Sequence, residues 1–235
     1  MTEEIYVAKF LICLAIFLKA SQLDLKERIV PNKYWKVMLL AVTPFNVVEF
    51  LSYSTFDFVF AIIQIAFVSS LAYLLYRIGA YGGADAKALM ALSYAFPHYP
   101  EVGSFPLLIK GFSFAFSTLA NAVIAAPLLA IYMFLSNLIK GNVSKGDVFY
   151  SFIGTKVRVE NFPEFYNLLE IARDGKVEKV RRGVEPDEKM LKELGKLKKE
   201  VWATPALPFL VFLTAGLIVA FFVGDVLIYV LSFIL

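Results

Sequence analysis

Apolar residues dominate this chain in long runs, separated by short polar segments and by one long polar segment. A membrane-spanning helix needs about 20 predominantly apolar residues. Six runs approach that pattern, although the fourth is short and carries Lys87 near its start. The runs are Ile5–Ala20, Tyr34–Tyr53, Phe56–Tyr76, Ala84–Phe96, Phe112–Ile139 and Pro205–Val223. Because backbone groups in lipid must be satisfied internally, each run is predicted to be a helix.

The long polar segment, residues 141–200, holds 13 of the 23 Lys and Arg residues and 11 of the 20 Asp and Glu residues. Residues 155–159 alternate as a short strand does, and Asp174-Gly175 is typical of a hairpin turn. Pro186–Leu194 is predicted to be a helix with acidic residues in its first turn. The insert is therefore predicted to fold as a small mixed α/β domain.

The predicted fold is an all-α polytopic membrane protein with six transmembrane helices and this small mixed α/β domain between the fifth and the sixth. Three regions follow: residues 1–140 form a five-span membrane region, 141–200 a cytoplasmic domain, and 201–235 the sixth helix with a C-terminal tail. Residues 226–235 are too short to span a membrane alone, so they either extend the sixth helix or lie at the interface.

Cations are concentrated in the loops of one side, after the first, third and fifth runs. The opposite loops, residues 52–57 and 97–106, carry none, and Lys110 is the exception on that side. The positive-inside rule therefore predicts that both termini lie outside and that the polar insert lies in the cytoplasm.

Composition excludes several classes of protein. The apolar share is 59%, against roughly 45–50% in soluble domains, so this is expected to be a membrane protein in contact with lipid. A net charge of +3 in one mixed-sign segment is not that of a nucleic-acid binder. The single cysteine, Cys13, excludes a disulfide framework and a multi-thiolate zinc site, and we expect no metal and no cofactor. Cys13 itself is predicted to be a small core or lipid-facing residue.

Two carboxylates stand out by their place in this topology. Asp24 lies just past the inner end of the first run, and Asp85 opens the fourth, inside Gly82-Gly83-Ala84-Asp85-Ala86-Lys87. The second and third runs go out and back between them, so both acids are predicted to lie at the same membrane face. Two carboxylates held close share one proton. The ionised one can activate water while the protonated one donates to a peptide carbonyl, as in aspartic proteases.

Each acid also has a purely structural interpretation: Asp24 as an acid in an interfacial loop, and Asp85 as a helix N-cap. Lys87 follows Asp85 by two residues, so its side chain is expected to point away from it and to extend to the interface. His98 is interpreted as a turn residue. Glu49 and Asp225 lie near the outer ends of their runs, on the wrong face for the pair.

Two motifs resemble those of a known family. The segment Asp24-Leu-Lys-Glu-Arg-Ile-Val-Pro31-Asn32 is similar to the first-aspartate segment of type IV prepilin peptidases, and the segment from Gly82 to Lys87 is similar to the motif that names the GxGD membrane aspartyl proteases. Ala84 replaces a glycine of that motif, which suits the looser form of the archaeal enzymes. The polar domain and the following Trp202–Pro208 segment resemble archaeal preflagellin (prearchaellin) peptidases.

This resemblance implies an aspartyl endopeptidase at the cytoplasmic face that removes short basic signal peptides from preflagellins or prepilin-like precursors. Carried over by position, Asp24 and Asp85 become the catalytic pair, and Gly82, Gly83 and Ala84 set the geometry of the second aspartate. Bacterial prepilin peptidases add a cysteine-ligated zinc loop and a methyltransferase activity. This chain has neither the cysteines nor room for that loop, so it is predicted to be a peptidase without methyltransferase activity.

Three other hypotheses remain open at this stage. A broader prepilin peptidase would also process pilins or related precursors. A small transporter would use Asp24 and Asp85 for proton or cation coupling, although both lie at one face and not near the midplane. A structural or assembly subunit would use the inner domain to recruit a partner, and both aspartates would then be dispensable.

Overall fold

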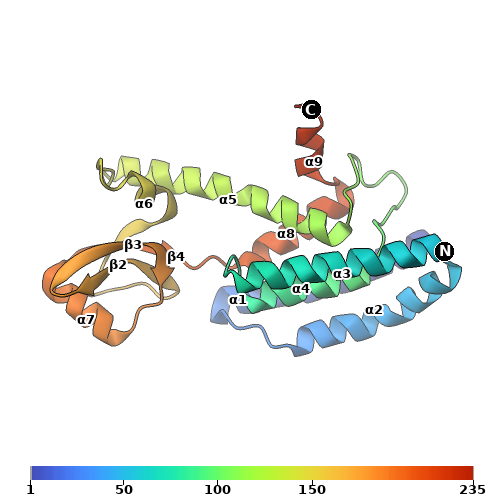
Figure 1. Cartoon of the computed structure of the whole chain (residues 1–235), viewed down its shortest axis with the longest axis horizontal. Helices are drawn as coiled ribbons and strands as arrows, with labels where there is room; N and C mark the ends of the chain where they lie inside the picture. Colours follow the sequence, from blue (N-terminus) through green and yellow to red (C-terminus); the bar gives the residue numbers. More distant parts are fainter. Residues whose placement is uncertain (1, 235) are drawn as a thin grey trace. The chain divides into compact units, whose positions relative to one another are not determined.

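The computed structural model describes residues 2–234, and most of them are helical (Figure 1). The helices are α1 (Thr2–Glu27), α2 (Lys33–Ser52), α3 (Thr55–Arg77), α4 (Gly83–Ala95), α5 (Phe114–Ile139), α6 (Val148–Ile153), α7 (Glu188–Leu197), α8 (Phe209–Phe222) and α9 (Val226–Leu231). The strands are β1 (Thr155–Arg158), β2 (Tyr166–Arg173), β3 (Lys176–Val184) and β4 (Glu200–Pro205). The chain divides into two compact units. The first unit comprises Met1–Ala125 together with Pro208–Leu235, and the second comprises Ala126–Leu207.

Each of the six predicted apolar runs overlaps one of these helices. Within residues 2–234, three of them are long and apolar enough to cross a membrane: α2, α3 and α5. A membrane protein is therefore supported, whereas the six spans are not confirmed. The helices α4 and α8, of 13 and 14 residues, are shorter than a full span requires.

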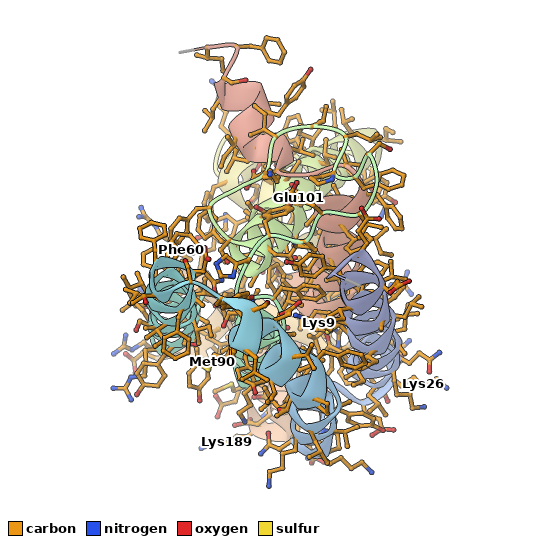
Figure 2. The ribbon with its side chains drawn as sticks, turned by 90° about the vertical axis from the view of Figure 1, so that its right-hand side faces the viewer. Lys9, Lys26, Phe60, Met90, Glu101 and Lys189 are labelled. Carbon is orange, nitrogen blue, oxygen red and sulfur yellow. The ribbon has the colours of Figure 1, made fainter. Side chains whose placement is uncertain are left out.

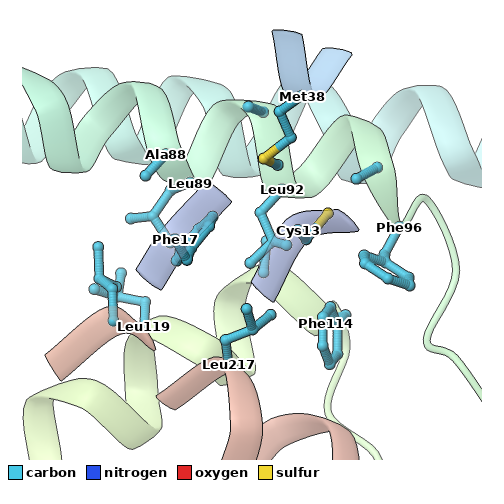
Figure 3. Packing of buried hydrophobic residues seen from close by; sticks show 14 of the residues in the cluster. Cys13, Phe17, Met38, Ala88, Leu89, Leu92, Phe96, Phe114, Leu119 and Leu217 are labelled. Atoms are coloured by element: carbon cyan, nitrogen blue, oxygen red, sulfur yellow. The ribbon is translucent and has the colours of Figure 1, made fainter. Parts of the chain in front are cut away.

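The core of the first unit forms where α1 packs against α2 and α8, and where α4 packs against α1, α2, α3 and α8. Figure 3 shows the side chains that meet there, among them Phe17 of α1, Leu89 and Leu92 of α4, and Leu217 of α8. Cys13 is fully buried in this cluster, as the predicted core position requires and the lipid-facing position does not. Most residues of α4 are buried, and the helix contacts both α1 and α8.

The second unit contains an antiparallel sheet with the strand order β1-β4-β2-β3 among its described residues. The predicted first strand is β1, and the predicted hairpin joins β2 to β3 through Asp174 and Gly175, both with positive φ. Asp187 caps α7 by accepting the N–H of Met190 at 2.7 Å. Leu194 of α7 packs on Leu168 and Val201 of the sheet. The small mixed domain is thus confirmed.

Candidate active site

Asp24 lies in the last turns of α1, half-buried beside the first turn of α8. Its Oδ2 accepts the backbone N–H of Leu210 at 3.3 Å. The first N–H groups of a helix have no partner inside the helix, and their dipoles favour negative charge. The start of α8 therefore holds one oxygen of Asp24 and stabilises its ionised form.

The pKa of Asp24 is raised above its usual value because partial burial penalises the charged carboxylate. The hydrogen bond from Leu210 and the nearby positive charge of Arg28 act in the opposite direction. Asp24 stays partly exposed near the end of α1. The result is a carboxyl group whose proton is retained to higher pH than in an exposed aspartate.

The side of α1 that carries Asp24 is fixed to α8 by two further hydrogen bonds. Ser21 Oγ donates to the carbonyl oxygen of Leu210 at 3.0 Å and lies 2.8 Å from Thr214 Oγ1. Both hydroxyl groups are buried. Ser21 thus binds the carbonyl group of Leu210, and Asp24 binds its N–H group. Together these contacts fix the rotation of α1 against α8 at the site.

Asp85 is the third residue of α4, and its side chain is only 6% exposed. Its Oδ2 accepts the backbone N–H of Gly82 at 2.9 Å, just before the helix begins. This contact turns the carboxyl group back toward the start of α4. The N-cap interpretation of Asp85 is therefore wrong in position: Gly82 is the N-cap of α4, and Asp85, the third residue of the helix, accepts the N–H of that N-cap residue.

The glycines before Asp85 are not equivalent. A Cβ atom on Gly82 would lie 3.2 Å from Asp85 Oδ2, which is tighter than an ordinary contact. A Cβ atom on Gly83 would meet Tyr76 at 3.4 Å, an ordinary van der Waals distance. Ala84 packs partly buried against the helical core. Of the three motif positions, Gly82 is the one whose lack of a side chain makes room for the carboxylate.

Contacts of α4 with α1 and with α8 place the two aspartates in the same part of the helical unit, although they are 61 residues apart in the sequence. The rings of Tyr81 and Phe209, the residues before Gly82 and Leu210, stack with their centres 5.7 Å apart. Both carboxyl groups lie at helix starts, α8 for Asp24 and α4 for Asp85. No group of three or more His, Cys, Asp or Glu side chains among the described residues could hold a metal ion. Chemically, the site offers two carboxyl groups at neighbouring helix starts.

Lys87 points away from this pair, as its spacing from Asp85 predicts. Its Nζ donates to Asn32 Oδ1 at 2.8 Å, and both side chains are exposed. Asn32 belongs to the segment that follows Asp24. Both residues belong to the two motifs, but their spacing in the sequence does not predict that they touch.

The remaining acids in the apolar helices have structural partners. Glu49 forms an ion pair with Lys9 at 2.7 Å, and both side chains are buried. Figure 2 shows Lys9 directed into the helical bundle, in contrast to the exposed Lys26. Asp225 caps α9 and accepts the hydroxyl of Ser117 at 2.6 Å. Lys9 was not predicted as a paired residue, although a lysine inside an apolar run signals a buried acidic partner.

Apolar helices long enough to cross a membrane, together with a small antiparallel domain, define the class: a helical membrane protein with one polar domain. Residues 10–131, which include both aspartates, match the type IV leader peptidase family. Residues 146–226 match a family described as archaeal peptidase A24 C-terminus, type II. The chain belongs to the type IV leader peptidase family, which confirms the resemblance found in the sequence.

Similar proteins come from methanogenic archaea. A preflagellin peptidase of Methanococcus voltae is 32% identical, over 88% of this chain and 91% of that protein. A preflagellin peptidase of Methanocaldococcus jannaschii is 26% identical, over 88% of this chain and 89% of that protein. The prepilin peptidase EppA of Methanothermobacter thermautotrophicus is 28% identical, over 53% of this chain and 34% of that protein.

Proposed function

We propose that this protein is a membrane-embedded aspartyl endopeptidase that removes the short basic signal peptide from preflagellins. The observation that carries the proposal is that Asp24 and Asp85, which come from helices far apart in the sequence, bind the backbone at the starts of two helices, α8 and α4, that contact each other. Two relatives that align with nearly the whole chain bear the name preflagellin peptidase, which supports this choice of substrate.

The reaction uses the two carboxyl groups as a general base and a general acid. Two carboxyl groups held close do not both ionise readily, so the pair holds one proton. The ionised carboxylate takes a proton from water, and the resulting hydroxide attacks the scissile carbonyl carbon. The protonated partner donates its proton to the carbonyl oxygen, which gives a tetrahedral gem-diol. As the C–N bond breaks, the first carboxyl group passes the proton taken from water to the leaving amine, and the second takes a proton back from the gem-diol.

Of the three motif positions Gly82, Gly83 and Ala84, the first sets the geometry of Asp85 in this proposal. The hydrogen bond from Gly82 N–H supports that role, as does the distance of 3.2 Å that would separate a Cβ atom at Gly82 from Asp85 Oδ2. No metal or cofactor takes part in the proposed reaction, and no methyltransferase activity is proposed.

The topology proposed with this function has six spans, both termini outside, and the active site at the cytoplasmic face of the cell membrane. The cations of the loops that follow the first, third and fifth runs support that orientation. Residues 141–200 then form a cytoplasmic domain between the five-span region 1–140 and the last span in 201–235. A precursor would present its hydrophobic segment within the membrane and its basic leader to the cytoplasm.

A second candidate is a broader prepilin peptidase that also processes pilin-like precursors. The match to the prepilin peptidase EppA favours it. Both candidates use the same site and differ only in the range of precursors that they accept. A direct comparison of two precursor types distinguishes them.

The test is cleavage of a preflagellin that carries its leader by the detergent-solubilised protein, with the product N-terminus identified by mass spectrometry. We expect a single cut just before the hydrophobic segment. Asp24→Asn and Asp85→Asn should each abolish cleavage, because each removes one half of the acid–base pair. A pilin precursor run in parallel measures the breadth of substrates.

A matched control is Asp174→Asn, in the exposed β2–β3 turn, where asparagine also tolerates the positive φ. This variant should cleave as the wild type does. Cleavage retained by either Asp24→Asn or Asp85→Asn would refute the proposed pair. If a folded wild-type sample cleaves neither precursor, the peptidase proposal itself fails, and flux measurements in liposomes would then test the transporter hypothesis.

A further inference from the structure

A hydrogen bond joins the two segments that carry the candidate aspartates. Lys87 Nζ donates to Asn32 Oδ1 at 2.8 Å, across 55 residues of sequence. Lys87 follows Asp85 by two residues, and Asn32 follows Asp24 by eight. The contact is therefore a direct link between the loop after α1 and the first turn of α4.

The side chain of Asn32 is committed to this contact. Asn32 is the N-cap residue of α2, where an asparagine normally accepts a backbone N–H of the first turn. Here its side chain makes no capping hydrogen bond. The loop holds it in place instead, because Pro31 O accepts the N–H of Tyr34 at 3.3 Å and Val30 packs against the core. The acceptor is thus presented to Lys87 by a restrained segment.

On α4, Lys87 lies on the face opposite to Asp85. Two residues along an α-helix correspond to a rotation of about 200°. Anchoring Lys87 on one face therefore fixes the direction in which Asp85 points on the other. Gly82 precedes this turn and Gly83 opens it, and neither residue has a side chain that could restrain the turn. The anchor therefore adds to the hydrogen bond between Gly82 and Asp85 at two positions with a flexible backbone.

We infer that Lys87 is a positioning residue for the reaction: its hydrogen bond to Asn32 fixes the rotation of the first turn of α4 and so holds Asp85 toward Asp24. The inference rests on the proposed function. Lys87 acts through Asp85 and does not touch the reacting atoms. An exposed hydrogen bond adds little to overall stability. A small misplacement of a reacting group, in contrast, lowers a rate by up to about a hundredfold.

The first measurement is the kinetics of precursor cleavage by Lys87→Met. We expect kcat to fall by about tenfold to a hundredfold with KM within about twofold of the wild type, because substrate binding is intact and the carboxyl group is displaced. Asn32→Leu should cause the same loss, and the double variant should lose no more than either single variant. Lys87→Arg keeps a donor and Asn32→Asp keeps an acceptor, so each of these variants should retain a kcat close to that of the wild type.

The matched control is Lys36→Met, an exposed lysine one turn into α2. It removes the same charge near the same loop and should leave kcat unchanged. A purely structural role for Lys87 would instead lower the amount of folded protein, with kcat per folded molecule as in the wild type. Such a result, or an unchanged kcat in Lys87→Met, overturns the inference.

A second measurement needs no catalysis. Asp24→Cys and Asp85→Cys are combined in a Cys13→Ala background, and the rate of disulfide formation is compared with and without Lys87→Met. We expect crosslinking to slow by at least about threefold when Lys87 is replaced, since the cysteine at position 85 would then sample other directions. An unchanged crosslinking rate overturns the inference even if the wild type cleaves precursors. If the wild type cleaves nothing, the proposed function fails, whereas the crosslinking rate still decides whether Lys87 holds position 85.

Discussion

Gly82 and Gly83 are adjacent in the sequence, but only one of them is in close contact with a candidate aspartate. A Cβ atom at Gly82 would lie 3.2 Å from Asp85 Oδ2, whereas one at Gly83 would meet the ring of Tyr76 at 3.4 Å. Gly82 also donates its N–H to the same oxygen. A methyl group at position 82 must therefore displace the carboxylate by a few tenths of an ångström, while one at position 83 fits.

We predict that Gly82→Ala lowers the rate of precursor cleavage by about tenfold, because a shifted carboxylate reacts less efficiently. Gly83→Ala is the matched control and should stay within about twofold of the wild type. The measurement is kcat for both variants, with thermal unfolding as a check on folding. Equal losses of kcat in the two variants would show that the contact with Asp85 is not the reason why position 82 requires a glycine.

At the scale of elements, β4 organises the small domain, and the sequence analysis did not predict it. β4 pairs with β1 on one side and with β2 on the other, so it lies inside the sheet. Glu170 of β2 is 1% exposed and accepts the N–H of Trp202 at 3.0 Å as well as Lys198 Nζ at 2.9 Å. One buried carboxylate thus connects β2 to Lys198, just after α7, and to Trp202 in the middle of β4.

Replacing Glu170 by alanine should lower the free energy of unfolding of the small domain by about 1–3 kcal/mol, because the buried N–H of Trp202 loses its acceptor. Glu178→Ala is the control. Its carboxylate is exposed and lies 4.0 Å from Arg173, so the change should stay within about 0.5 kcal/mol. Fluorescence of Trp202 during unfolding, in a Trp35→Phe background, reports on this domain. Equal destabilisation by both substitutions would contradict the role given to Glu170.

At the scale of the helical unit, a buried ion pair ties α1 to α2. Lys9 and Glu49 are 0% and 2% exposed, and their charged atoms are 2.7 Å apart. Lys9 Nζ also lies 5.1 Å from the centre of the Phe96 ring. Two charges away from water are tolerated because each compensates the other, and removal of one leaves the other buried without a counter-charge.

We predict that Lys9→Met and Glu49→Met each destabilise the helical unit by about 3–5 kcal/mol, and that the double variant regains most of this loss. Thermal unfolding in detergent measures all three variants. The exposed pair Lys110–Glu101 is the control, and Lys110→Met should change the stability by less than about 1 kcal/mol. Additive losses in the double variant would mean that the pair is not energetically coupled.

The sequence by itself determined the features that depend on neighbours in the chain. Apolar runs predicted every long helix, and the Asp174-Gly175 pair predicted the β2–β3 hairpin, because both signals act over a few residues. The two motifs around Asp24 and Asp85 also identified the family, although their catalytic role stays a prediction. β4 escaped because its short sequence, which ends in a proline, has no clear strand pattern without its partners.

Only the tertiary structure decided which distant groups meet. The N–H of Leu210 reaches Asp24, Lys87 reaches Asn32, and Lys9 reaches Glu49, over separations of 186, 55 and 40 residues. Such contacts depend on the rotation and depth of each helix against its neighbours. An apolar run of nearly uniform hydropathy contains little information about that rotation, since most of its faces are equally apolar. Packing in three dimensions sets the rotation, and with it the surroundings of both aspartates.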